Sequence, residues 1–142
     1  MSDCIFCDII EGHCPASIVY SDEAVVAFMD IQPVNKGHVL VVPRLHSSNL
    51  ADMDEDEAAA CIVVAKKIAA AIRSTSLPCQ GVNLFLADGE AAGQEVFHVH
   101  LHVFPRYEKD GFGLHFSDEY TKLPPRSELD EVAAKIKDAL TT

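Results

Sequence analysis

The sequence predicts one α+β domain that spans residues 1–142. The stretches HVHLHVF and GVNLFLAD alternate as half-buried β-strands do, and short turns between consecutive predicted strands favour antiparallel pairing. One long segment between these strands carries apolar side chains at helical spacing. Of the 142 residues, 49% are hydrophobic, which is enough for one core and argues against disorder. We therefore expect about five strands and two main helices.

The first half of the chain predicts three strands and the long helix. Strands are expected at 17–20 and 24–29, joined by a short polar turn, and at 38–42, after a glycine turn and before a proline. The helix is expected over 53–74, where acids crowd the first turn and basic residues lie further on, as the helix dipole favours. Its predicted apolar stripe consists of Ala58, Cys61, Ile62, Ala65, Ile68, Ala69 and Ile72.

The second half predicts two strands and a C-terminal helix. A strand over about 82–87 leads through a glycine-flanked loop, DGEAAGQ, into a strand over 98–105. The stretch that follows, YEKDGFGLHFSDEY, has no regular period. A helix is expected over about 127–140, because Ser127 and the acid three residues later resemble a capping box.

The fifth predicted strand contains three histidines, His98, His100 and His102, in the stretch HVHLHVF. In a strand these three side chains point to one face, while the apolar residues between them enter the core. Each imidazole has two nitrogens that need partners, so such a row can bind a metal, move protons or attack an electrophile. The alternative is a polar strand that faces solvent, although such strands more often carry Thr, Lys or Glu.

Composition excludes several classes of protein. The net charge of −11 argues against a long contact with a nucleic-acid polymer, which needs a basic stripe. No apolar run reaches about 18 residues, so we expect no membrane span, and the N-terminus lacks the basic start of a signal peptide. The five cysteines are odd in number, and we expect them to be reduced in a cytoplasmic protein.

The N-terminal pair Cys4-x-x-Cys7 allows three interpretations. The pair could be a redox motif, but the βαβ context of thioredoxin-like proteins is absent. The two thiols could also have no role. Together with His46 and His98 they make two cysteines and two histidines, a set suited to tetrahedral zinc.

Three segments resemble the histidine triad (HIT) family: CIFCDIIEG, DIQPVNKGHVLVVPRLH and AGQEVFHVHLHVFPR. The resemblance covers a core of about 4–106 and is weakest in the tail and helix of 107–142. It implies a HIT-like fold, a five-stranded antiparallel sheet flanked by helices. It also implies a homodimer that binds a purine nucleotide or nucleotide conjugate and hydrolyses or transfers nucleoside monophosphates.

The resemblance also assigns roles to residues of the predicted site. The middle histidine, His100, is the nucleophile that would form a covalent nucleotidyl-histidine. Its other ring nitrogen needs an acceptor, for which we expect a backbone carbonyl. His102 would contact a phosphate oxygen or the leaving group, as a protonated imidazole, and His38 would join the same network. Asp30 matches the acid that accepts hydrogen bonds from both ribose hydroxyls.

Other residues of the matched segments would line the nucleotide. Phe6, Phe28 and Ile31 are expected to form an apolar slot for the base, although each could equally be core. Gly93 and Gln94 would offer backbone N–H groups and a side-chain amide. The chain departs from the family at Ala87, often Asn, and at Glu95, often Ser or Thr. An ionised Glu cannot donate a hydrogen bond, which affects the expected leaving-group preference.

The resemblance implies a structural zinc ion held by Cys4, Cys7, His46 and His98, since all four family positions are present. The three histidines would then divide the work: the first binds metal, the second attacks and the third assists. The enzyme would act on nucleoside phosphoramidates or dinucleoside polyphosphates. The alternatives are a nucleotide-binding regulatory or scaffold protein with little turnover, and a metal-dependent hydrolase with the whole triad on one ion. The aromatic stretch 109–116 is expected to pack at the dimer or to reach the partner's site.

Overall fold

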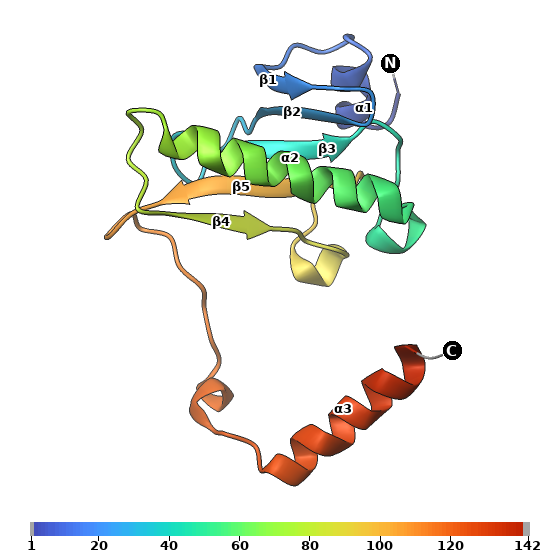
Figure 1. Cartoon of the computed structure of the whole chain (residues 1–142), viewed down its shortest axis with the longest axis vertical. Helices are drawn as coiled ribbons and strands as arrows, with labels where there is room; N and C mark the ends of the chain where they lie inside the picture. The colour runs from blue at the N-terminus through green and yellow to red at the C-terminus, as the bar shows by residue number, and fades with distance from the viewer. Residues whose placement is uncertain (1, 141–142) are drawn as a thin grey trace. The chain divides into compact units, whose positions relative to one another are not determined.

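The computed structural model describes residues 2–140 and divides into two compact units, the first ending at Gly111 and the second beginning at Phe112. The first unit contains the whole sheet and two α-helices, and the second contains the C-terminal helix (Figure 1). The α+β class predicted from the sequence is confirmed.

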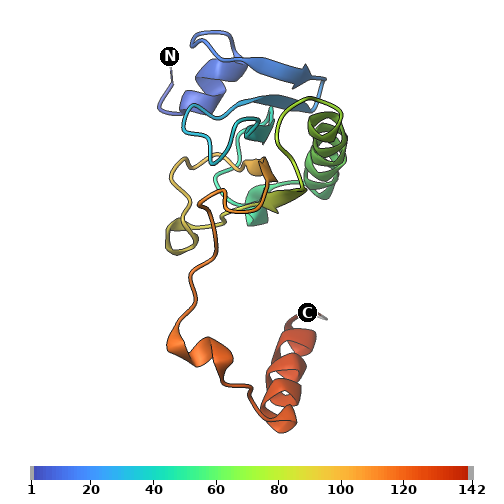
Figure 2. The same cartoon turned by 90° about the vertical axis from the view of Figure 1, so that its left-hand side faces the viewer.

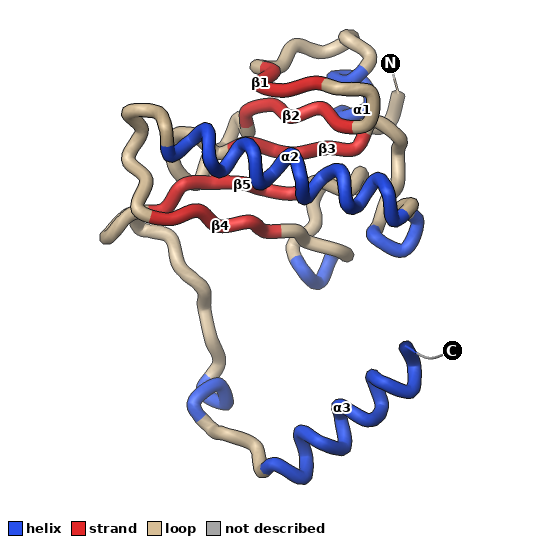
Figure 3. Tube along the Cα trace, viewed as in Figure 1, coloured by secondary structure: helices blue, strands red, loops and turns tan. Residues whose placement is uncertain are grey.

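The first unit contains a five-stranded sheet in which every neighbouring pair is antiparallel (Figure 3). The strand order is β1-β2-β3-β5-β4, so the last strand along the chain lies inside the sheet. The predicted five-stranded antiparallel sheet is confirmed. The strands are β1 (Ile18–Ser21), β2 (Val25–Met29), β3 (Val39–Pro43), β4 (Gly81–Phe85) and β5 (Leu101–Arg106).

The long helix α2 (Glu55–Arg73) crosses one face of the sheet (Figure 1). Three acids lie in its first turn and Arg73 in its last, which suits the helix dipole. The predicted stripe needs a correction, because Ala58 and Ile62 are exposed and Val64 is buried. At 100° per residue, Ile62 lies at one edge of the stripe and Val64 at the other, so the buried face is turned toward Val64, while Ala58 lies in the first turn of the helix.

A short helix, α1 (Ile5–Ile10), packs on the opposite face of the sheet from α2 (Figure 2). Its N-cap is Cys4, whose Sγ accepts a hydrogen bond from the Cys7 N–H at 3.4 Å. Phe6 of α1 joins Val26, Phe28, Leu40 and Val42 in a second apolar cluster. Strand residues alternate between the two faces, so the neighbours of these residues, such as Val25 and Val41, pack under α2 instead.

The same alternation determines which face carries the candidate site. Leu40 pairs with His102 across β3 and β5, and Phe28 pairs with Leu40 across β2 and β3. His102 therefore lies on the face that carries α1. The regular part of β5 begins at Leu101, so the predicted strand over 98–105 is too long at its start: His98 and His100 precede it in irregular backbone.

The second unit contains a short 3-10 helix, η3 (Asp118–Thr121), and α3 (Arg126–Leu140). The predicted C-terminal helix is therefore confirmed, and it begins one residue earlier than expected. No residue of α3 is buried. Its apolar side chains nevertheless form a stripe at helical spacing, which consists of Leu129, Val132, Ile136 and Leu140. No helix among residues 2–140 combines the length and the apolar character that a membrane crossing requires.

Candidate functional site

The three histidines of the HVHLHVF stretch have different surroundings. His98 is completely buried and its ring faces two cysteines and a third histidine. His100 is buried beside Phe6, and one-fifth of the His102 side chain is exposed. The three rings thus lie in three different environments, and the division of work among them stays a prediction.

A backbone acceptor fixes which nitrogen of a neutral His100 ring carries the hydrogen. Its Nδ1 lies 2.8 Å from the carbonyl oxygen of His98. Because a carbonyl oxygen only accepts, Nδ1 must carry the hydrogen, and Nε2 is left with a free lone pair. The ring edge of Phe6 supports this orientation, with centroids 5.0 Å apart and planes at 85°.

A second hydrogen-bond chain orients His38 and His102. The Val34 N–H donates to Nδ1 of His38 at 3.0 Å, so the neutral His38 ring carries its hydrogen on Nε2. This Nε2–H donates to Nδ1 of His102 at 2.9 Å. His102 must therefore carry its own hydrogen on Nε2, where it is a donor for a bound group.

Both rings of this chain are neutral at neutral pH. Burial, together with the neighbouring His100 and His38, lowers the pKa of His102 from 6.5 to about 4. Burial also lowers the pKa of His38, against the opposing charge of Asp30. In the ligand-free chain His102 is therefore a neutral donor through its Nε2–H, and its expected protonation beside a bound substrate stays a prediction.

Asp30 follows β2 and contacts this chain. Its Oδ2 lies 3.4 Å from Nε2 of His38 and 3.9 Å from Nδ1 of His102. Its Oδ1 accepts from the Gln32 N–H at 2.8 Å, which fixes the carboxylate plane. Asp30, His38 and His102 have the spacing of a metal site. However, the Val34 N–H keeps the hydrogen of His38 on Nε2, and a protonated nitrogen cannot ligate a metal.

The residues expected to contact the base divide into two kinds. Phe6 and Phe28 are buried in the second apolar cluster, with ring centroids 5.4 Å apart. Ile31 is 97% exposed beside Asp30, so it is the accessible apolar side chain of the three.

The loop before the histidines is closed by its own hydrogen bonds. Gln94 is buried; its Oε1 accepts from the Gly89 N–H at 2.8 Å, and its Nε2 donates to the carbonyls of Ser48 and Val96. The side-chain amide expected to face a ligand is thus occupied within the loop. The Gly93 and Gln94 N–H groups likewise donate to loop carbonyls, while the Glu95 side chain is exposed.

A second cluster brings together Cys4, Cys7, His46 and His98, all with ligand atoms within 4.8 Å of one another. Nδ1 of His98 lies 3.3 Å from the Cys4 Sγ, 3.6 Å from the Cys7 Sγ and 3.2 Å from the His46 Nδ1. The Nε2–H of His98 donates to the Pro43 carbonyl at 2.8 Å, so its Nδ1 lone pair faces the cluster. Such an outer hydrogen bond is usual for a metal-binding imidazole, and the donor set fits a tetrahedral metal.

The Cys7 thiol is protonated without a metal. Burial and the hydrogen bond with Cys4 raise the pKa of the Cys7 thiol to about 11. Because the thiolate is the ligand form, metal binding would release protons. The cluster opens onto a surface recess of ≈ 660 Å³ beside Ser48, Glu95 and Phe97, which gives an ion a route to the ligands.

Sequence reasoning missed two groups that orient the rings, the Val34 N–H and the Pro43 carbonyl. Both belong to the backbone, so no side-chain signal marks them. The one sequence signal for the Pro43 carbonyl as the acceptor for His98 is that Pro43 ends a predicted strand close to the predicted metal ligand His46.

Comparison with known proteins agrees with this architecture. A family model described as HIT domain matches residues 11–109. An uncharacterized HIT-like protein of Borreliella burgdorferi is 48% identical over 115 residues, 80% of this chain and 83% of the relative. Protein hit of Bacillus subtilis is 41% identical over 141 residues, 99% of this chain and 96% of the relative. The crystal structure of a HIT family protein from Bacillus anthracis superposes with a TM-score of 0.88, at 40% identity and 97% coverage of both chains.

Three other solved relatives have more specific descriptions. A Zn-bound histidine triad family protein from Mycobacterium smegmatis has a TM-score of 0.75 and 36% identity, over 96% of this chain and 97% of its own. A histidine triad nucleotide-binding protein from Candida albicans has a TM-score of 0.86 and 29% identity, over 98% of both chains. A HIT family hydrolase from Legionella pneumophila has a TM-score of 0.65 and 32% identity, over 75% of this chain and 95% of its own. The matched family model, the relatives and the shared fold together show that this chain belongs to the HIT family.

Proposed function

We propose that the protein is a nucleotide-binding hydrolase or transferase that cleaves at the α-phosphate of nucleoside phosphoramidates or dinucleoside polyphosphates. One observation carries this proposal: the His98 carbonyl holds the hydrogen of His100 on Nδ1 and leaves Nε2 as a nucleophile. The descriptions of the Candida albicans relative as nucleotide-binding and of the Legionella pneumophila relative as a hydrolase support the same class.

In the proposed first step, the Nε2 lone pair of His100 attacks the α-phosphorus, and the bond to the leaving group breaks. The N–P bond forms a nucleotidyl-histidine, and the leaving group takes the bonding electron pair. In the second step, water attacks the same phosphorus and gives up a proton to solvent, the N–P bond breaks with its electron pair returning to Nε2 of His100, and the nucleoside monophosphate leaves. The Nε2–H of His102 would donate to a phosphate oxygen as charge develops there.

The two kinds of leaving group differ in whether they need a proton from His102. A polyphosphate can leave as an anion, whereas an amine must gain a proton. His102 is neutral in the ligand-free chain, but an anionic phosphate beside it would raise its pKa and favour the protonated form. Asp30 would accept hydrogen bonds from the ribose hydroxyls, and the exposed Ile31 would contact the base.

We further propose that Cys4, Cys7, His46 and His98 hold a structural zinc ion. The donor set, the orientation of His98 and the Zn-bound relative from Mycobacterium smegmatis support this proposal. With four protein ligands the ion would have no open position for substrate, so it would stabilise the fold rather than take part in the reaction.

The proposed assembly is a cytoplasmic homodimer in which residues 1–142 act as one domain. The unburied apolar stripe of α3 supports a partner for this helix. A second function, a nucleotide-binding regulatory protein with little turnover, is favoured by Glu95, which replaces a hydrogen-bond donor, and by the occupied amide of Gln94.

Intact-protein mass spectrometry after brief mixing with an adenosine phosphoramidate tests the proposed reaction. Wild type should gain the mass of one nucleoside monophosphate, and His100→Ala should gain none while it still binds nucleotide. Turnover of the variant should fall by on the order of 10³-fold or more. Binding without adduct or product in wild type would favour the regulatory protein.

A further inference from the structure

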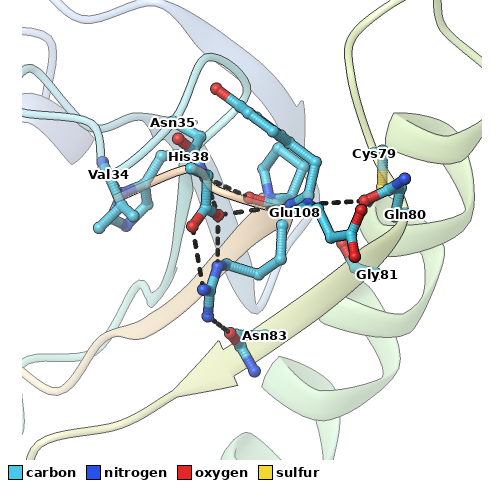
Figure 4. Close-up of polar contacts among 12 residues, drawn as sticks. Val34, Asn35, His38, Cys79, Gln80, Gly81, Asn83 and Glu108 are labelled. Atoms are coloured by element: carbon cyan, nitrogen blue, oxygen red, sulfur yellow. Dashed lines mark hydrogen bonds and ion pairs between the residues drawn. The ribbon is translucent and has the colours of Figure 1, made fainter. Parts of the chain in front are cut away.

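An ion pair between the half-buried Arg106 and the buried Asp110 lies at the end of β5, outside the residues assigned above. The Asp110 side chain is only 2% exposed. Its Oδ2 accepts from Nε of Arg106 at 2.6 Å, and its Oδ1 accepts from Nη2 of the same guanidinium at 3.1 Å. The guanidinium also donates through Nη1 to the Asn83 Oδ1 at 2.7 Å (Figure 4). A two-pronged contact of this kind holds a carboxylate in one orientation.

The carboxylate of Asp110 also holds Asn35, which is buried. Nδ2 of Asn35 donates to Asp110 Oδ2 at 2.8 Å and to the Pro105 carbonyl at 2.9 Å, so both amide hydrogens are used. Asn35 belongs to the turn between β2 and β3, whereas Asp110 and Pro105 belong to β5 and the residues after it. The two hydrogen bonds therefore attach the turn to the end of β5.

This turn lies beside His38 and makes two hydrogen bonds to it (Figure 4). The Asn35 carbonyl accepts from the His38 N–H at 3.2 Å, and the preceding residue, Val34, donates its N–H to the ring Nδ1. Gly37 has a φ of +104°, and a Cβ there would lie 3.1 Å from the Leu77 Cδ1 and 3.3 Å from the Pro105 Cγ. The turn is thus tightly packed against β5, and its backbone has little freedom to move while Asn35 stays attached.

We propose that Asn35 and Asp110 are positioning residues that fix the hydrogens of the histidine chain; the catalytic part of this inference rests on the proposed function. If the Val34 N–H moves away, His38 can carry its hydrogen on Nδ1, and its Nε2 becomes an acceptor. Nδ1 of His102 must then donate, and Nε2 of His102 loses the hydrogen that faces a ligand. Through Asn35 and its turn, the ion pair of Arg106 and Asp110 thus determines whether Nε2 of His102 carries a hydrogen and can donate it.

Two variants and one control test this inference in the full-length protein. Asn35→Ala removes the attachment of the turn, and Asp110→Asn leaves one oxygen and an NH₂ group where two oxygens now accept. Asn83→Ala is the matched control, because it removes a partner of the same guanidinium without touching Asn35. The measurement is the ring ¹⁵N chemical shift of His38 and His102 in ligand-free protein, which reports the tautomer directly and requires no substrate.

Wild type and Asn83→Ala should show hydrogen on Nε2 of both rings, and the two test variants should show mixed tautomers. If wild type turns over a phosphoramidate, the test variants should lose kcat on the order of tenfold with little change in KM. Unchanged tautomers in folded Asp110→Asn and Asn35→Ala protein would overturn the inference, as would shifted tautomers with an unchanged kcat. If Asn35→Ala does not fold, Asp110→Asn decides. A wild type without turnover would contradict the proposed reaction, while the chemical shifts would still test the positioning.

Discussion

Acidification should destabilise the protein through His102, and the size of the effect follows from its pKa. Burial lowers this pKa in the folded state to about 4, while the ring titrates near 6.5 when exposed. Between these values the unfolded chain binds the proton and the folded chain does not, so stability is lost as the pH falls from about 6.5 to about 4. At pH 5 the linkage relation gives a loss of about 2 kcal/mol relative to pH 7.5.

The assay is urea unfolding of wild type and His102→Asn at pH 7.5 and pH 5.0. The asparagine does not titrate, so the variant should lose about 2 kcal/mol less than wild type on acidification. Titrating groups that do not contact His102 are common to both proteins and cancel in the difference. An identical pH dependence of the free energy of unfolding in the two proteins would refute the reasoning.

Three further predictions concern the metal cluster and the loop before the histidines. A chelator should lower the melting temperature of metal-loaded wild type by roughly 10 °C, and should have no effect on Cys4→Ser/Cys7→Ser; an unchanged wild type would contradict metal binding. Gln94→Ala should reduce the free energy of unfolding by about 1–3 kcal/mol, since three buried hydrogen bonds to the backbone are lost; urea unfolding measures this, and a neutral effect would show that water replaces the amide. Glu95→Ser should raise the rate of phosphoramidate cleavage by supplying a hydroxyl donor, with Glu95→Ala as the control; equal rates in both variants would remove residue 95 from the leaving-group contact.

The sequence predicts the sheet and the two longer helices because their patterns repeat. The continuous apolar runs of β2 and β3 are a consequence of burial on both faces of the sheet, and the period of α2 follows from one buried face. The helix α1 was missed, since six residues are too few to show a period. Its Cys4 cap and the packing of Phe6 are tertiary features.

The sequence names the residues that lie together at the candidate site, but it does not show the charge of His102 or the hydrogen bonds of Gln94. The backbone acceptor of His100 was expected, and the structure identifies it as the carbonyl of His98. The charge of His102 was not predictable, because it depends on how much water reaches the ring. The hydrogen bonds of Gln94 were not predictable either, since one partner, the carbonyl of Ser48, lies 46 residues away along the chain.

The cysteine–histidine cluster joins three distant parts of the chain: α1, the segment after β3 and the segment before β5. Cys7 and His46 are 39 residues apart, and His46 and His98 are 52 residues apart. An ion held there would act as a cross-link that closes two large loops of the polypeptide, and opening the fold would separate its ligands. A colorimetric indicator that captures the released ion would then report the rate of unfolding. One ion would be released per chain, and the chain would need no optical label.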